Sequence, residues 1–204
     1  MDDDIVLSHV ENGIGWLSLN RPNKRNAINF SLASAVQEKM EEFDTDNSVH
    51  VIVIQGSGGS FSAGADMTEA LGAEEGGDRR FNPSRDAALR VASSEKPTIA
   101  SIDGPAYGAG ALLACGCDLR IITSRAKFRF PGADYGLVVG AAALTTLVGP
   151  VVAKELIFTS RVVEAQEAQT IGLVNRVVDG SKLISVTTEL AESIVSASPL
   201  ATTW

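Results

Sequence analysis

The chain has 204 residues, of which 45% are hydrophobic and 21% charged, a composition typical of a soluble globular enzyme with one well-buried domain. Its formal net charge of −8 argues against nucleic-acid binding and against a basic membrane-binding surface. The chain opens without a signal-peptide pattern, and no uninterrupted apolar stretch reaches ~18 residues, so we expect a cytoplasmic protein with no membrane partner.

The first quarter of the chain predicts a β-hairpin followed by a helix. The hairpin covers residues 5–20, with the strong turn signal Asn12-Gly13 between its strands. Residues 31–46 place apolar side chains at helical spacing, and Ser31 is the expected N-cap of this helix.

Strands and helices alternate along the rest of the chain, which indicates an α/β architecture. The β-branched apolar run at 49–56 is typical of a buried strand. Residues 141–198 are expected to be mostly helical, with an interruption at 172–179. The remaining predicted helices cover 83–95 and 108–115, and the remaining predicted strands cover 97–103 and 119–123.

Two glycine-rich loops each join a predicted strand to a predicted helix. The first is "GSGGSFSAGADM" (56–67), and the second is "DGPAYGAGALL" (103–113). Either loop alone is explained by a tight turn, for which glycine is suited. Neither has the spacing of a dinucleotide-binding motif or a P-loop, so nucleotide binding is not expected.

Taken together, the two loops predict an oxyanion hole. Two strand ends that carry small residues can aim two backbone N–H groups at one oxygen, and such donors require no particular side chain. The small residues that would let a substrate come close are Ala63, Gly64, Ala65, Gly108, Ala109 and Gly110.

The remaining metal-binding and nucleophilic residue types suggest no further site. Cys115 and Cys117 are too close for an unstrained disulfide, and no nearby histidine suggests a metal. We interpret both as buried thiols in a reducing compartment and predict no metal. His9 and His50 lie at predicted strand edges away from both loops and are not expected to be catalytic.

Four segments resemble the enoyl-CoA hydratase/isomerase, or crotonase, family in matching order and spacing: 18–29, 59–67, 104–121 and 161–178. The resemblance implies a crotonase-like spiral of ββα units, forming one domain over residues 1–204 and assembling as a homotrimer or hexamer. It implies an acyl-CoA thioester as substrate, with coenzyme A as part of that substrate and no other cofactor. It also implies further C-terminal helices after "SPLATTW", so we expect the C-terminal helical part to be shortened.

The resemblance assigns the two oxyanion-hole amides to Ala65 and Ala109, which would hold the thioester oxygen as an enolate forms. Lys24 and Arg25 are expected partners for the CoA phosphates, although a solvated basic turn is an equally good explanation. Asp66 has the alternative role of capping the helix that follows it. The residues implied in binding the substrate or its CoA are Lys24, Arg25, Asn26, Ala27, Ala63, Asp66, Met67, Tyr107 and Gly108.

The sequence departs from the family at the two glutamates that its hydratases use. Leu112 and Gly132 occupy those positions, and neither can transfer a proton. The nearest groups that could do so are Asp134 and Tyr135, if a pocket partly desolvates the carboxylate, with Glu69 as a second candidate. The alternative is an Asp134 that caps a loop or lies on the surface, with a packed Tyr135.

The predicted function is therefore an enzyme of fatty acid metabolism that stabilises the enolate of an acyl-CoA. Isomerisation, decarboxylation and thioester hydrolysis need less from side chains than hydration does, and they are preferred for that reason. The alternative is a CoA-thioester-binding or scaffold protein that has lost its chemistry, which the missing acids and the short C-terminal part favour.

Overall fold

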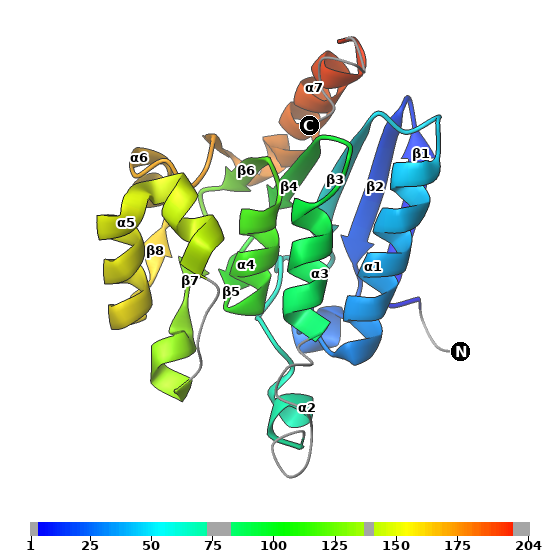
Figure 1. Cartoon of the computed structure of the whole chain (residues 1–204). Coiled ribbons are helices and arrows are strands. Elements are labelled where there is room, and N and C mark those ends of the chain that lie inside the picture. Colours follow the sequence, from blue (N-terminus) through cyan, green and yellow to red (C-terminus); the bar gives the residue numbers. More distant parts are fainter. Residues whose placement is uncertain (1–3, 73–82, 137–140, 198–204) are drawn as a thin grey trace.

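A computed structural model of the chain describes residues 4–72, 83–136 and 141–197. Its main element is a six-stranded sheet in the order β1-β2-β3-β4-β6-β9 (Figure 1). The strands are β1 (Val6–Glu11), β2 (Ile14–Leu19), β3 (Val51–Gly56), β4 (Thr98–Ile102), β6 (Leu119–Thr123) and β9 (Arg176–Val178). The β1–β2 pair is antiparallel, and the other neighbours are parallel.

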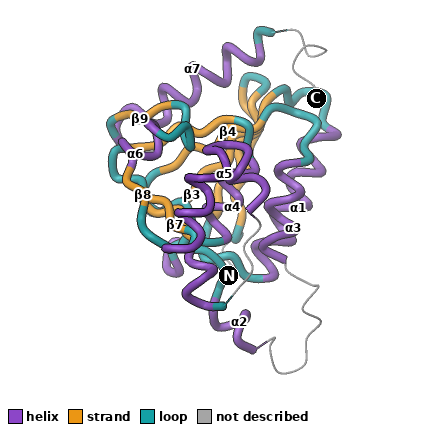
Figure 2. Tube along the Cα trace, turned by 60° about the vertical axis from the view of Figure 1, so that its left-hand side comes forward, coloured by secondary structure: helices purple, strands orange, loops and turns teal. Residues whose placement is uncertain are grey.

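Helices cover both faces of this sheet. Figure 1 shows α1, α3 and α4 on one face and α7 on the other, and α1 lies beside α3 in Figure 2. The helices are α1 (Phe30–Thr45), α2 (Met67–Gly72), α3 (Pro83–Ala92), α4 (Ala109–Gly116), α5 (Ala141–Thr159), α6 (Ala165–Thr170) and α7 (Leu183–Val195).

Strand β3 shows why the sheet needs helices on both sides. Ile52 and Ile54 pack into the hydrophobic cluster beneath α1 and α3, whereas Val51 and Val53 pack into the cluster beneath α7. All four side chains are fully buried, as expected for a parallel strand covered on both faces.

Several predictions from the sequence are confirmed, and one is wrong. The hairpin forms with Asn12 and Gly13 at its turn, both with positive φ, and the predicted strand 119–123 is β6. Ser31 is not the N-cap of α1. The first residue of this helix is Phe30, and its N-cap is Asn29, whose side chain accepts a hydrogen bond from the Leu32 N–H (3.0 Å). The sequence also predicts a polar, glycine-containing stretch at 72–82 before the helix 83–95, and residues 73–82 of it lie outside the described residues.

A second, three-stranded sheet was not predicted. It consists of β5 (Pro105–Tyr107), β7 (Lys127–Arg129) and β8 (Val163–Glu164). Strands of two or three residues are too short to show the alternation of apolar and polar residues from which a strand is predicted. This small sheet matters for the site because β5 leads directly into α4.

Helix α5 is the most apolar helix that faces outward. Among the described residues, its segment Ala142–Thr159 is long and apolar enough to cross a membrane, with a mean hydropathy of 1.4 and 17% of the segment buried. The backbone leaves the helical conformation at Gly149 (φ 75°, ψ 162°), directly before Pro150, so the segment is two helical pieces joined at a kink. A kinked helix of this kind is weak evidence for a membrane span.

Candidate active site

The two glycine-rich loops lie against each other at the ends of β3 and β4. Ser62 of the first loop pairs with Ala106 of β5 as in a parallel ladder. Gly64 is even closer to the second loop, because a β-carbon on it would lie 2.9 Å from the Tyr107 carbonyl oxygen and 3.6 Å from the Ala109 nitrogen. Only glycine fits at position 64, where φ is also +105°.

The N–H of Ala65 points away from Ile28, the residue that pairs with it on the neighbouring chain segment. The Gly64 carbonyl accepts a hydrogen bond from the Ile28 N–H (2.7 Å), and the Asp66 N–H donates to the Ile28 carbonyl (2.9 Å). Successive residues of an extended chain direct their N–H groups to opposite sides, so the Ala65 N–H points away from Ile28. Within the part of the chain that the structure describes, it has no protein acceptor.

Ala109 presents a second free N–H a short distance away. It is the first residue of α4, whose first-turn N–H groups have no partners inside the helix. Gly108 makes the approach to α4 in a conformation that glycine adopts readily (φ 50°, ψ −118°), with its own N–H bound to the Arg129 carbonyl. Over the described residues, the Ala109 N–H also lacks a protein acceptor.

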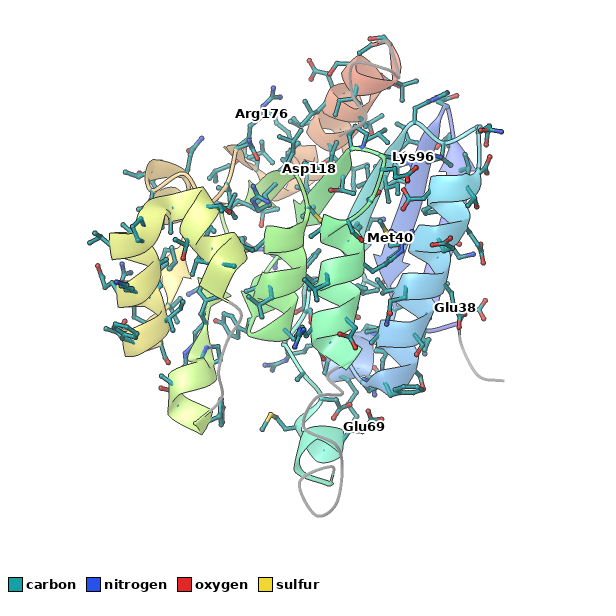
Figure 3. The ribbon with its side chains drawn as sticks, in the orientation of Figure 1. Glu38, Met40, Glu69, Lys96, Asp118 and Arg176 are labelled. Carbon is teal, nitrogen blue, oxygen red and sulfur yellow. The ribbon has the colours of Figure 1, made fainter. Side chains whose placement is uncertain are left out.

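The opposite end of α4 is fixed by a buried arginine. Arg120 is 3% exposed, and its guanidinium donates hydrogen bonds to the carbonyl oxygens of Ala114 and Cys117 at the C-terminus of α4. A cation at the C-terminus complements the helix dipole, whose positive end lies at Ala109. Figure 3 shows Asp118, just after α4, at the end of the molecule opposite to Glu69 of α2.

A third segment, residues 21–29, is joined edge to edge with the first loop. The Ala63 N–H donates to the Arg25 carbonyl (2.9 Å), and the buried Asn26 side chain donates to the carbonyls of Ser57 (2.9 Å) and Ser60 (2.7 Å). These bonds hold the segment against the loop that carries Ala65.

The predicted CoA-binding side chains of this segment face solvent. Lys24 and Arg25 are exposed, and Lys24 lines a cavity of about 250 Å³ together with residues 20–23. Ala27 is half-buried beside this cavity-forming turn. Nothing in the described contacts ties either positive charge to a carboxylate, since the ion pairs of the described residues include neither side chain.

Asp66 is bound to its own surroundings. Its carboxylate accepts hydrogen bonds from the Thr68 hydroxyl (2.6 Å) and backbone N–H (3.2 Å), and it pairs with Arg21 (3.0 Å). The Thr68 hydroxyl and the Arg21 guanidinium together hold the pKa of Asp66 below its ordinary value, against the opposing effect of burial. This geometry matches the capping alternative for the side chain, while the neighbouring Ala63 and Met67 are exposed.

Of the positions of the two missing glutamates, one lies within the second loop and one beside it, and neither carries a titratable group. Leu112 is half-buried and packs against the main hydrophobic core. Gly132 is buried in the short 3₁₀ helix Pro131–Tyr135, and Pro131 lies 3.8 Å from where a β-carbon on Gly108 would be.

The three candidate proton-transfer residues are engaged or exposed. The Asp134 carboxylate is paired with Arg129 (2.6 Å) and 42% exposed, so it is not desolvated in the way that the sequence suggested. Tyr135 is 56% exposed, which differs from a packed tyrosine. The Glu69 carboxylate accepts a hydrogen bond from the Phe30 N–H (2.8 Å) at the start of α1. Tyr107 is half-buried on β5, in register with Arg129.

The cysteines are buried, as expected. Burial raises the pKa of both Cys115 and Cys117 to about 12.

His9 stacks on Trp16 with ring centroids 6.1 Å apart, on the hairpin. Among the residues placed by the structure, no group of three or more His, Cys, Asp or Glu could hold a metal ion.

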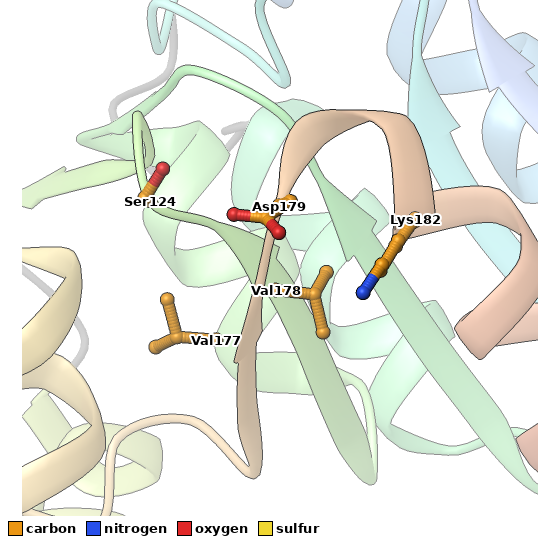
Figure 4. Close-up of a pocket in the computed structure, with 5 residues that line it drawn as sticks. All are labelled: Ser124, Val177, Val178, Asp179 and Lys182. Carbon is orange, nitrogen blue, oxygen red and sulfur yellow. The ribbon is translucent and has the colours of Figure 1, made fainter.

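A cavity of about 320 Å³ lies at the ends of β6 and β9, where Val177 and Val178 meet Ser124, Asp179 and Lys182 (Figure 4). None of the residues predicted for the site lines it. We give the candidate site at the two loops more weight, because two N–H groups without acceptors among the described residues lie there on loops in contact.

Sequence reasoning implied Asn26 only as a residue that binds the substrate or its CoA, and it missed the role of the side chains that hold the site together. These are the buried Asn26 and Ser62, the half-buried Arg21 and the buried Arg120. Asn26, Ser62 and Arg120 bind backbone carbonyls from other segments, which no local pattern reveals, and Arg21 binds the Ala27 carbonyl within its own segment. The sequence offered one signal for Asn26: it is a polar residue directly after a basic turn. Asparagine tolerates positive φ in turns, and the φ of Asn26 is +54°.

Residues 9–203 match the family model described as enoyl-CoA hydratase/isomerase. The short-chain-enoyl-CoA hydratase of Clostridium acetobutylicum is 35% identical over 98% of this chain and 79% of its own length. The crotonyl-CoA hydratase of Syntrophomonas wolfei is 37% identical over 98% and 78%. The crystal structure of an enoyl-CoA hydratase/isomerase from Xanthobacter autotrophicus Py2 superposes with a TM-score of 0.92 at 30% identity, over 98% of this chain and 76% of that one.

Proposed function

Since the chain belongs to the enoyl-CoA hydratase/isomerase family, we propose that it acts on an acyl-CoA thioester whose carbonyl oxygen binds the N–H groups of Ala65 and Ala109. The observation that carries this proposal is the pair of N–H groups, free of acceptors in the described part of the chain, on two loops in contact. Negative charge develops on the thioester oxygen when the α-carbon loses a proton or a carboxylate. Two fixed donors stabilise that charge, and removing one such donor costs about 10²–10³ in rate.

The CoA part of the substrate would lie along the joined segments 21–29 and 57–66. Lys24 and Arg25 are exposed there and free to neutralise phosphates, which Arg and Lys recognise well. The remaining binding positions flank the two donors, with Asp66 acting through its bonds to Arg21 and Thr68: they are Ala27, Ala63, Asp66, Met67, Tyr107 and Gly108.

Within this family we favour isomerisation, decarboxylation or thioester hydrolysis over hydration. Leu112 and Gly132 supply no acid or base at the positions that hydration would use. The relatives named above are hydratases by name, so the reaction of this chain has to be measured. Asp134 is our proposed base, with Tyr135 beside it. The carboxylate has to exchange its Arg129 partner for the substrate in order to act.

We extend the proposal to the setting of the enzyme: a cytoplasmic homotrimer or hexamer that needs no cofactor besides the CoA of its substrate. The same replacements, Leu112 and Gly132, favour a second candidate function, a CoA-thioester-binding or scaffold protein without turnover. Both candidates require thioester binding, and they differ in whether bonds are broken.

The test is mass spectrometry on saturated and unsaturated acyl-CoAs incubated with the protein in D₂O. The wild type is compared with Asp134→Asn and with the control Glu155→Gln, which alters another exposed carboxylate paired with an arginine (2.7 Å). Deuterium uptake or a shifted double bond that only Asp134→Asn abolishes would support enolate chemistry with Asp134 as base. Uptake that persists in Asp134→Asn would remove Asp134 from the mechanism. Binding without any reaction would favour the scaffold function.

The donors themselves are tested by Ala109→Pro. Proline is tolerated at the first position of a helix and removes the N–H there without breaking an intrahelical bond. Ala165→Pro is the matched control, because Ala165 is the first residue of α6 and lies outside both loops. We expect Ala109→Pro to lower turnover by about 10²-fold or more and Ala165→Pro to leave it unchanged. Equal turnover in the two folded variants would contradict the assignment.

A further inference from the structure

Ser62 lies where the three segments of the candidate site meet. The side chain is fully buried at 0% exposure. Its hydroxyl donates a hydrogen bond to the Asn26 carbonyl (2.8 Å) and accepts one from the Gly64 N–H (3.2 Å). The hydroxyl therefore links segment 21–29 to the residue that precedes Ala65.

The backbone of Ser62 is tied to the second loop. Its N–H donates to the Pro105 carbonyl (3.0 Å), and its carbonyl accepts a hydrogen bond from the Tyr107 N–H (2.9 Å). A β-carbon on Gly110, in the first turn of α4, would lie 2.5 Å from the Ser62 β-carbon and 2.7 Å from its hydroxyl oxygen. No space is left between Ser62 and the helix that begins at Ala109.

These contacts fix the position of the Ser62 side chain, which touches residues of both loops. The hydroxyl reaches Gly64 on the side of Ala65, while the β-carbon contacts α4 on the side of Ala109. Oxyanion donors act only when they are held at a fixed distance and direction from one oxygen. We infer that Ser62 is a positioning residue that sets the Ala65 N–H relative to the Ala109 N–H, an inference that rests on the proposed function.

The test compares Ser62→Ala with the matched control Ser101→Ala. Ser101 is also buried, at 1% exposure, and its hydroxyl bonds to the Thr187 hydroxyl (3.2 Å) between β4 and α7, on the face of the sheet opposite to α4. Three quantities are measured in each protein: the amide resonances of Ala65 and Ala109 in ¹⁵N-alanine-labelled samples, kcat for the acyl-CoA that the wild type turns over fastest, and Kd for free CoA, which carries no acyl carbonyl.

We expect Ser62→Ala to move both amide resonances and to lower kcat by about 10-fold to 100-fold, with Kd for free CoA changed by less than about twofold. Ser101→Ala should change none of the three, although both variants lower the melting temperature. Unmoved Ala65 and Ala109 resonances, or a loss of kcat no larger than in Ser101→Ala, would overturn the inference. If the wild type turns over no thioester, the proposed function fails, and the two resonances alone decide whether Ser62 positions the donors.

Discussion

Gly110 lies so close to Ser62 that a β-carbon on the glycine would come within 2.5 Å of the Ser62 β-carbon. The same β-carbon would lie 2.8 Å from the Ser62 carbonyl oxygen, which is bonded to the Tyr107 N–H and cannot move away freely. The first turn of α4 and the first loop are therefore in contact through a position that admits only hydrogen.

Gly110→Ala tests this contact. Alanine is favoured over glycine in a helix by about 1 kcal/mol, whereas overpacking a filled interior costs about 1–3 kcal/mol. We expect a net loss of up to about 2 kcal/mol in the free energy of unfolding, measured by urea denaturation, together with reduced thioester turnover. Gly180→Ala is the control, because a β-carbon there meets nothing within 4 Å. A Gly110→Ala variant more stable than the wild type would mean that the two loops are further apart.

The acid stability of the protein should depend on Asp66. Its pKa in the folded chain is lowered from 3.8 by Thr68 and Arg21, so the unfolded chain binds the proton more tightly. The stabilisation is therefore complete well above pH 3.8 and is lost as the pH falls through the folded pKa. Unfolding curves of the wild type and Asp66→Asn should differ at pH 7 and converge as the pH falls below the pKa of Asp66 in the folded chain. Asp179→Asn removes an exposed carboxylate outside this network, and the same convergence there would assign the effect to net charge.

The two thiols should be unreactive in the folded protein. With a pKa of about 12 for Cys115 and Cys117, about 10⁻⁴ of each is thiolate at pH 8, and neither sulfur is exposed. A thiol reagent such as DTNB should label neither cysteine within minutes in buffer and both in denaturant. Rapid labelling of one equivalent in the native protein would show that the α4 region opens.

Ser160 offers a stabilising substitution. It is 2% exposed with φ at +50°, and its hydroxyl has no hydrogen-bond partner among the described residues. Ser160→Gly relieves about 1–2 kcal/mol of backbone strain and removes an unsatisfied hydroxyl, against about 0.5–1 kcal/mol for the greater freedom of glycine in the unfolded chain. We expect a gain of about 1 kcal/mol, or about 2–4 °C in Tm.

Ser160→Ala separates the two contributions, because it removes the hydroxyl but keeps the positive φ. It should gain less than Ser160→Gly. The Ser160 carbonyl accepts a hydrogen bond from Arg129 (2.7 Å), and neither change removes that backbone group. A lower stability of Ser160→Gly than of the wild type would contradict this prediction and would mean that Ser160 adopts its positive φ without strain.

The fold could be predicted where buried strands and helices require apolar residues at a regular spacing along the sequence. β3 begins with a continuous apolar run over residues 51–54 because both faces of the sheet are covered, and α1 shows a regular apolar stripe because one side faces the core. The small sheet could not be predicted, because β5, β7 and β8 are held by pairing between distant segments rather than by their own sequences.

The candidate site could be predicted in its backbone and not in its side chains. Close approach requires glycine at 64 and 110, and the small residues at 63–65 and 108–110 are visible in the sequence. The partner of a carboxylate is not visible: Asp134 pairs with Arg129 and Glu69 caps α1, and both contacts follow from how the chain is packed in three dimensions.

Because the proposed donors are main-chain groups of two alanines, an alanine scan of this protein would treat both positions as unchanged. Loss of function in such a scan would appear instead at neighbours such as Ser62 and Gly110, which hold the amides in place. Relatives could exchange the side chains at 65 and 109 for other small ones and retain the same hydrogen-bond donors. The two hydrogen-bond donors would then be retained wherever the backbone keeps the same conformation. Sequence identity at residues 65 and 109 would be a poor measure of whether the oxyanion hole is retained.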